Sequence, residues 1–312
     1  MSAIGVDIGG TKSLAVRLTE SAEAARSMVE HDPATAPLEQ ILESIASVDA
    51  DDATAIGIGI AGLVNPGDGA LVWGPHLPGT NMRIRDAVEA RFSRPTVVDN
   101  DANMALFGEL RMGVAVGYSD VLLVTLGTGI GGAIAIDGEI FRGGAFAGEW
   151  GHMQVERNGD LCDCGKRGCW ETLASGPALV RLAREVVSAN PESSLARVLG
   201  ARSATEQITA ESVVAAADSG DETARSLVAE VGRALGQGLA DLVAIFDPEL
   251  VIVGGGLGSV GESILGPARR VIADSLHGGS LRVPPPVLVA GLGPAAGAIG
   301  AAIMATEANH GG

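Results

Sequence analysis

Residues 3–12 read AIGVDIGGTK, and residues 121–132 read VLLVTLGTGIGG. In each stretch, a short apolar run of the kind that forms a buried strand leads into a turn rich in glycine and threonine. A second strand-like run follows each turn, at 13–18 and at 133–137. The two halves of the chain therefore open alike, which predicts two related α/β domains around a central cleft.

The rest of the chain alternates helical patterns with short buried runs. Helices are predicted at 38–48, 83–92, 102–112, 175–190, 209–218, 221–246, 261–276 and 294–308, and strands at 55–60, 96–98, 250–253 and 287–290. We expect an N-terminal domain over 1–117, completed by the helix at 294–308. A C-terminal domain over 118–293 is expected to carry a metal-binding loop and the surface for oligomerisation.

Composition and charge exclude several classes of protein. The 312 residues include 45 glycines without a collagen period, and 46% are hydrophobic, which excludes intrinsic disorder. The net charge of −17 has no basic patch to offset it, so nucleic acid is excluded as a partner. Only 3% of residues are aromatic, which favours a site that reads its ligand by hydrogen bonds over one that stacks against it.

The chain shows no targeting or membrane signal. Its first ten residues have neither the basic nor the apolar region of a signal peptide, so a cytoplasmic location is expected. Residues 283–305 carry no charge and are long enough to span a bilayer, but they contain several prolines and glycines. A buried strand, a loop and a helix are expected there instead.

The three cysteines lie close together and follow a histidine. The spacing His152-x9-Cys162-x-Cys164-x4-Cys169 offers one imidazole and three thiolates, which satisfy tetrahedral Zn²⁺ and leave no open position. Such a closed zinc site is structural. Three buried free thiols, or a redox pair, are the alternatives.

Two glutamates flank the cysteine cluster. Glu149 precedes His152 by three residues, and Glu171 follows Cys169 by two. Zinc would therefore bring Glu149, His152 and Glu171 together. Two carboxylates and an imidazole suit the recognition of a molecule with many hydroxyls, since each can hold one or two of them. Solvated surface acids are the alternative.

Residues 99–103 read Asp-Asn-Asp-Ala-Asn between a predicted strand and a predicted helix. Either Asn100 or Asp101 can cap the helix. Because the motif also contains a carboxylate at the end of a strand, Asp101 is a candidate general base.

Three glycine-rich turns follow strands, at 7–12, 126–132 and 254–258. Glycine lets backbone N–H groups approach a phosphate closely, although tight hairpin turns would look the same. Dinucleotide binding is a weak alternative, because a strand follows the second turn and the third lacks the acid expected about 20 residues on. No P-loop motif occurs.

Taken together, these residues resemble the ROK family of sugar kinases and repressors. The matching motifs are DxGGTK at 7–12, NDAN at 100–103, LGTGIGG at 126–132, AGExGH at 147–152, CxCGxxGCxE at 162–171, ASG at 174–176 and VGGG at 253–256. Residues 162–176 and Phe-Asp-Pro at 246–248 are most similar to the actinobacterial glucokinases of that family. The resemblance implies the actin-like ATPase fold, with a ribonuclease-H-like core in each half.

The resemblance also implies roles for residues. Asp101 would take the proton from the 6-hydroxyl of a sugar, and other hydroxyls would bind Asn100, Glu149, His152 and Glu171. The residues facing the ATP phosphates and Mg²⁺ would be Asp7, Gly9, Gly10, Thr11 and Lys12. The second phosphate loop would comprise Gly127, Thr128, Gly129, Gly131 and Gly132. The residues near the adenosine would be Gly254, Gly255 and Gly256.

The expected activity is the ATP-dependent phosphorylation of a hexose at O6, with glucose as the favoured substrate. Kinases of N-acetylmannosamine or N-acetylglucosamine, and a sugar sensor without catalysis, are the alternatives. Many relatives have a Trp near residues 77–81, where this chain reads Leu-Pro-Gly-Thr-Asn. The chain also opens without the helix-turn-helix of repressor members. A homodimer or homotetramer is expected, and the sequence leaves polyphosphate open as a donor in place of ATP.

Overall fold

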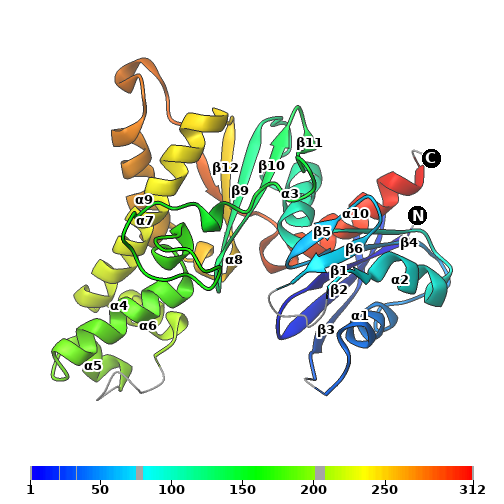
Figure 1. Cartoon of the computed structure of the whole chain (residues 1–312), viewed down its shortest axis with the longest axis horizontal. Coiled ribbons are helices and arrows are strands. Elements are labelled where there is room, and N and C mark those ends of the chain that lie inside the picture. Colours follow the sequence, from blue (N-terminus) through cyan, green and yellow to red (C-terminus); the bar gives the residue numbers. More distant parts are fainter. Residues whose placement is uncertain (1, 21, 33, 75–79, 201–207, 311–312) are drawn as a thin grey trace. The chain divides into compact units, whose positions relative to one another are not determined.

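The computed structural model describes residues 2–20, 22–32, 34–74, 80–200 and 208–310, and Figure 1 shows its elements along the chain. The chain forms two compact units, each of which is made of segments distant in sequence. The first unit consists of Met1–Leu123, Ala133–Gly148 and Ala290–Gly312. The second consists of Val124–Gly132 and Glu149–Val289. The mixed α/β architecture is the one expected.

The first unit is built on a five-stranded sheet in the order β3-β2-β1-β4-β8. Its strands are β1 (Ser2–Ile8), β2 (Lys12–Thr19), β3 (Ala22–Glu30), β4 (Ala53–Ile60) and β8 (Thr96–Asn100). β1, β4 and β8 run parallel, and Ile8, Ile60 and Asn100 are in register at their carboxyl ends. Asp7 and the Asn100–Asp101 turn therefore reach the same edge of the sheet, which is where parallel sheets bind ligands.

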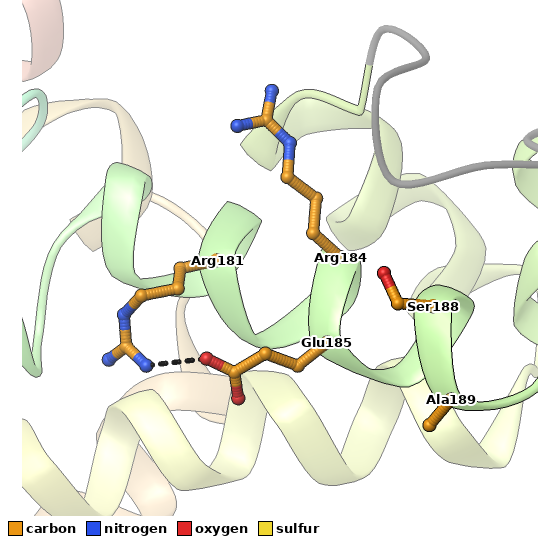
Figure 2. Close-up of a pocket in the computed structure, with 5 residues that line it drawn as sticks. All are labelled: Arg181, Arg184, Glu185, Ser188 and Ala189. Carbon is orange, nitrogen blue, oxygen red and sulfur yellow. Dashed lines mark hydrogen bonds and ion pairs between the residues drawn. The ribbon is translucent and has the colours of Figure 1, made fainter.

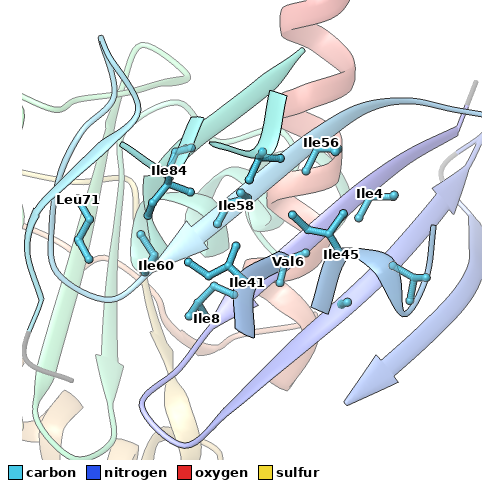
Figure 3. Packing of buried hydrophobic residues seen from close by; sticks show 14 of the residues in the cluster. Ile4, Val6, Ile8, Ile41, Ile45, Ile56, Ile58, Ile60, Leu71 and Ile84 are labelled. Atoms are coloured by element: carbon cyan, nitrogen blue, oxygen red, sulfur yellow. The ribbon is translucent and has the colours of Figure 1, made fainter. Parts of the chain in front are cut away.

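One face of this sheet is buried by aliphatic side chains. Isoleucines from β1 and β4 pack against α1 (Pro37–Ala46) and α2 (Ile84–Phe92), and Figure 3 shows this cluster. β-branched residues favour strands and fill such a core without aromatic rings. The members labelled in Figure 3 are Ile4, Val6, Ile8, Ile41, Ile45, Ile56, Ile58, Ile60, Leu71 and Ile84.

The last helix packs on the sheet at very close range. α10 (Ala296–His310) contacts β1, β4 and α3 (Asp101–Met112). A Cβ atom on Gly5 would lie 1.9 Å from the carbonyl oxygen of Ala298, and one on Gly57 would lie 1.9 Å from that of Ala301. Only glycine fits at these two strand positions, because any side chain would meet the backbone of α10.

A small three-stranded sheet completes the first unit. It comprises β5 (Leu63–Asn65), β6 (Ala70–Trp73) and β7 (Met82–Arg83), which sequence patterns did not predict. β5 ends at a turn in which the N–H of Gly67 donates to Asn65 Oδ1 at 3.0 Å. The turn at 65–67 follows the usual chemistry of Asn-Pro-Gly.

The second five-stranded sheet has the order β11-β10-β9-β12-β13. Its strands are β9 (Val121–Leu126), β10 (Ile130–Ile136), β11 (Glu139–Ile140), β12 (Leu250–Gly254) and β13 (Val287–Val289). The predicted strand, turn and strand at 121–137 are confirmed. The turn spans only 127–129, however, so the predicted loop to residue 132 was too long. β-branched Ile130 and the apolar residues after it extend the strand.

Most helices of the chain lie in the second unit. They are α4 (Gly176–Ala189), α5 (Ser194–Leu199), α6 (Ala210–Asp218), α7 (Glu222–Phe246), α8 (Gly255–Gly258) and α9 (Glu262–Ser275), with 3-10 turns η1 (Trp150–His152), η2 (Trp170–Thr172) and η3 (Gly279–Leu281). The predicted loop at 254–258 is wrong, because α8 begins directly after β12. Gly255, at a φ of 80°, reverses the chain within one residue.

The uncharged stretch at 283–305 forms a strand, a turn and a helix, as expected. β13 is followed by the 3-10 turn η4 (Gly293–Ala295) and then by α10. Across the described part of the chain, no helix is both long and apolar enough to cross a membrane.

Candidate active site

In the first unit, a tight turn joins β1 to β2 and begins after Ile8, the residue that follows Asp7. The N–H of Gly9 donates to the carbonyl oxygen of Lys12 at 3.0 Å. From outside the turn, the N–H of His31 donates to the carbonyl oxygen of Thr11 at 2.9 Å. Gly10, Thr11 and Lys12 are exposed. The turn is thus fixed at both ends while its tip is open to a ligand.

Asp7 and Asp101 form a pair of acids in the first unit. Burial, with the nearby charge of Asp101 as a second cause, raises the pKa of Asp7 to about 7. Burial also raises the pKa of Asp101, although a hydrogen bond from the N–H of Ala102 opposes this. A buried carboxyl group with a raised pKa is reluctant to ionise until a cation approaches, and carboxylate oxygens are ligands that Mg²⁺ prefers, so Asp7 fits a Mg²⁺ site.

Gly297, at the start of α10, lies directly against Asp7. A Cβ atom there would be 2.7 Å from Asp7 Oδ2. Sequence reasoning missed this glycine, because only the folded chain brings α10 to the end of β1. The absence of a side chain at 297 therefore leaves room for the carboxylate.

The Asn100–Asp101 turn begins α3. Asn100 is the N-cap, and its Oδ1 accepts from the N–H groups of Ala102 at 2.9 Å and Asn103 at 3.3 Å. Asn100 Nδ2 donates to the carbonyl oxygen of Gly62 at 3.2 Å. The capping interpretation is therefore confirmed for Asn100. Asp101 occupies the first position of the helix, which fixes its backbone.

Asp99 lies beneath this turn in a network of hydrogen bonds. Its Oδ1 accepts from Asn103 Nδ2 at 2.9 Å and from the N–H of Asn100 at 2.7 Å. Its Oδ2 accepts from Arg142 Nε at 2.7 Å. Asp99 is 1% exposed, so the guanidinium of Arg142 compensates a fully buried charge. No local pattern in the sequence marks Arg142 as its partner.

In the second unit, the predicted metal ligands come together. The ligand atoms of His152, Cys162, Cys164 and Cys169 all lie within 4.8 Å of one another. Cys164 Sγ is 3.6 Å from Cys169 Sγ, and Cys162 Sγ is 3.6 Å from His152 Nδ1. The three thiols are free, so they form no disulfide. One imidazole and three sulfurs at this spacing fit a tetrahedral zinc ion.

Glu171 lies beside this cluster. Its Oε1 is 3.1 Å from His152 Nδ1 and accepts from Cys162 Sγ at 2.9 Å. The structure thus brings together His152 and Glu171, two of the three side chains expected to meet. Glu149 is exposed and immediately precedes η1, where its carbonyl oxygen accepts from the N–H of His152 at 3.2 Å.

The turn at 127–129 is bound to its surroundings through its backbone. The N–H of Gly127 donates to the carbonyl oxygen of Gly129 at 3.0 Å, and Gly127 in turn accepts from the N–H of Gly176 at 2.9 Å. Gly127 and Thr128 are exposed. A Cβ atom on Gly127 would meet nothing within 4 Å, so a phosphate could approach the backbone there.

Other glycines of the expected nucleotide site are placed differently. Gly131 and Gly132 belong to β10, and Gly132 packs under the ring of Trp150, where a Cβ would lie 1.9 Å from the ring. Gly254 is buried in β12, whereas Gly255 and Gly256 are exposed. Residues 77–79 of the segment in which relatives carry a Trp lie outside the described residues.

The second unit also has an open cavity on the surface of α4, shown in Figure 2. Its volume is about 750 Å³, and it is lined by Arg181, Arg184, Glu185, Ser188 and Ala189. None of these is a predicted site residue. Arg181 instead forms ion pairs with Glu185 and Asp160. It also donates to the carbonyl oxygen of Thr172, the residue after Glu171, and so holds α4 against the segment that carries Glu171.

Comparisons with known proteins identify the family of the chain. The model of the ROK family matches residues 3–308. A glucokinase from Streptomyces coelicolor is 39% identical over 310 residues, which cover 97% of each chain. A solved ROK family glucokinase from Streptomyces griseus, in complex with glucose and AMPPNP, is 40% identical with a TM-score of 0.89, covering 98% of this chain and 100% of the other. A xylose repressor from Caldicellulosiruptor bescii is 36% identical over 218 residues, which cover 70% of this chain but 54% of the repressor.

Proposed function

The chain belongs to the ROK family, and we propose that it is a glucokinase, which transfers a phosphoryl group from ATP to the 6-hydroxyl of glucose. The full-length likeness to two glucokinases supports this activity. The observation that carries the proposal is the position of Asp101. This residue lies on the first turn of α3, at the carboxyl edge of the sheet, and is close enough to Asp7 to raise the pKa of Asp7.

Asp101 is proposed as the general base. Its raised pKa makes it a stronger base than an ordinary aspartate, which favours removal of the proton from a hydroxyl as the phosphoryl group arrives. Phosphoryl transfer otherwise needs positioning and charge neutralisation more than covalent chemistry. Asn100 fixes Asp101 by capping the same turn.

The remaining charge is neutralised by few groups, in keeping with the acidic chain. Asp7 would hold Mg²⁺, which supplies positive charge at the phosphates when bound. The backbone of the turns at 9–11 and at 127–129, in which Gly10, Thr11, Gly127 and Thr128 are exposed, would hold the phosphates together with the side chains of Lys12 and Thr128. Gly255 and Gly256, exposed at the start of α8, would lie near the adenosine.

The sugar would be held by charged groups of the second unit. Glu171 Oε1 and His152 Nδ1 lie 3.1 Å apart. The carboxylate of Glu171 can accept from a sugar hydroxyl, and the ring nitrogen of His152 that does not bind zinc can donate to one. Zinc bound by His152 and the three cysteines would fix the loop that carries them. Glu149 and Asn100 would contribute further hydrogen bonds.

A panel of hexoses tests the proposal. ADP release is measured with ATP and saturating glucose, mannose, N-acetylglucosamine or N-acetylmannosamine, and then with polyphosphate in place of ATP. We expect the highest kcat/KM with glucose and ATP. If only an N-acetylated sugar is phosphorylated, that sugar and not glucose is the substrate. If a hexose binds but is not phosphorylated, the protein is a sugar sensor.

A further inference from the structure

Gly129, in the turn between β9 and β10, contacts a side chain of the sugar site. A Cβ atom built on Gly129 would lie 2.7 Å from Glu171 Oε2, closer than real Cβ atoms approach oxygen. The other carboxylate oxygen, Oε1, already faces His152 Nδ1 and Cys162 Sγ. The carboxylate of Glu171 is therefore held between the metal cluster and the turn.

The backbone around Glu171 is held by contacts on both sides. Trp170 is fully buried, and its Nε1 donates to the carbonyl oxygen of Ala234 at 2.8 Å. On the other side, Thr172 Oγ1 donates to the carbonyl oxygen of Cys169 at 2.7 Å, and Arg181 binds the carbonyl oxygen of Thr172. A side chain at 129 would therefore move the carboxylate group of Glu171 and leave the backbone in place.

We propose that Gly129 is a positioning residue for the sugar, which acts by leaving room for the carboxylate of Glu171. This inference rests on the proposed function, because it assigns Glu171 to the hexose. It gives the turn at 127–129 two roles: its exposed backbone faces the nucleotide phosphates, and its last glycine sets the position of a group that binds the sugar. A substitution at 129 then changes sugar affinity.

The same turn offers a matched control. A Cβ atom on Gly127 would meet nothing within 4 Å, and neither glycine has the positive φ that would strain an alanine. Gly127→Ala and Gly129→Ala thus add the same atom to the same turn. Only the second meets Glu171, and the atom that it meets is the free end of a flexible side chain, so both variants are expected to fold.

The experiment compares the two variants with the wild-type protein. We measure glucose binding by calorimetry without nucleotide, and the KM for glucose and for ATP separately. Gly129→Ala should weaken glucose binding and raise the KM for glucose by about 10-fold, because a displaced group loses its hydrogen-bond geometry. Gly127→Ala should leave glucose binding without nucleotide unchanged, because its added atom meets nothing. Both variants alter the turn proposed to hold the ATP phosphates, so the specific readout of Gly129→Ala is the loss of glucose affinity that Gly127→Ala lacks.

A double-mutant cycle with Glu171→Ala identifies the route of the effect. In the Glu171→Ala background, Gly129→Ala should add less than about 2-fold to the loss, because the atom that it displaces is gone. Equal effects of Gly129→Ala in both backgrounds would overturn the inference, as would normal glucose binding by Gly129→Ala. Either result would contradict the role of Gly129 but not the assignment as a kinase. A wild-type protein that neither binds nor phosphorylates a hexose would overturn the assignment as a kinase and the role of Gly129 together.

Discussion

Arg142 Nε donates to Asp99 Oδ2 at 2.7 Å, and Asp99 precedes the proposed base, Asp101, by two residues. Arg142 comes from the segment after β11, so it joins a distant part of the first unit to the end of β8. The pair does more than neutralise charge, because the other oxygen of Asp99 binds the N–H of Asn100 and the side chain of Asn103. The turn that carries the base thus depends on a buried carboxylate.

Replacing Arg142 by alanine should destabilise the protein by about 2–4 kcal/mol, because the buried carboxylate of Asp99 loses its partner. The guanidinium side chain is 30% exposed, which limits the loss. Urea denaturation measures the free energy of unfolding. Adding Asp99→Asn to Arg142→Ala should restore part of the lost free energy of unfolding, since the buried negative charge of Asp99 is then removed. An Arg142→Ala protein as stable as wild type would show that the ion pair contributes nothing.

Asp7→Asn should stabilise the protein in the absence of Mg²⁺ and nucleotide. Burial raises the pKa of Asp7 from 3.8 to about 7, so the folded state binds the proton more tightly than the unfolded state. Stability from this group is present below pH 4 and is lost as the pH rises to about 7. The variant should therefore gain about 2–4 kcal/mol over wild type at pH 8, and much less at pH 4.

Urea denaturation of both proteins across this range, with chelator present, measures the difference. A gain in stability that is the same at pH 4 and pH 8 would show that the ionisation of Asp7 is not its cause. The same variant should lose most of its kinase activity, because the amide is a poorer ligand for Mg²⁺ than a carboxylate.

Gly297→Ala should lower kcat by about 10-fold, because the new methyl group would displace the carboxylate of Asp7. The effect should appear in the dependence of the rate on Mg²⁺ concentration, which reports on the position of Asp7. Circular dichroism checks that α10 remains folded. Unchanged kcat and Mg²⁺ dependence would mean that Asp7 tolerates the shift and needs no glycine beside it.

Cys164→Ser should reduce zinc content and melting temperature together. Cys164 is exposed, so loss of its sulfur removes a metal ligand without creating a cavity in the core. Asp163→Ser is the matched control, because Asp163 is an exposed neighbour in the same loop. Metal analysis and thermal denaturation measure the two quantities. Full zinc content in Cys164→Ser would refute its assignment as a ligand.

The features that sequence predicted are those encoded over short distances. The strand, turn and strand units at 3–18 and 121–137 follow from apolar runs that end in glycine. The cluster of possible metal ligands follows from spacing, since His152 and the cysteines lie within one short segment. β3 was missed, because Ala22–Glu30 has no buried apolar run and pairs with β2 as a largely exposed edge strand.

The features that sequence missed depend on tertiary contacts. Arg142 and Asp99 are 43 residues apart, and no pattern joins them. Gly5, Gly57 and Gly297 look like any other glycines until α10 packs against the sheet. The contact of Gly129 with Glu171 likewise arises only when the loop with the cysteines folds beside the β9–β10 turn.

Asp101 is proposed to act as the base in hexose phosphorylation, and the turnover of Asp101→Asn is the sharpest test of that role. The measurement is kcat with saturating glucose and ATP, beside the KM for glucose and a circular dichroism spectrum. Loss of the base should lower kcat by about 10²–10⁴, in a folded protein that still binds glucose. A folded Asp101→Asn protein with kcat near that of wild type would contradict that role.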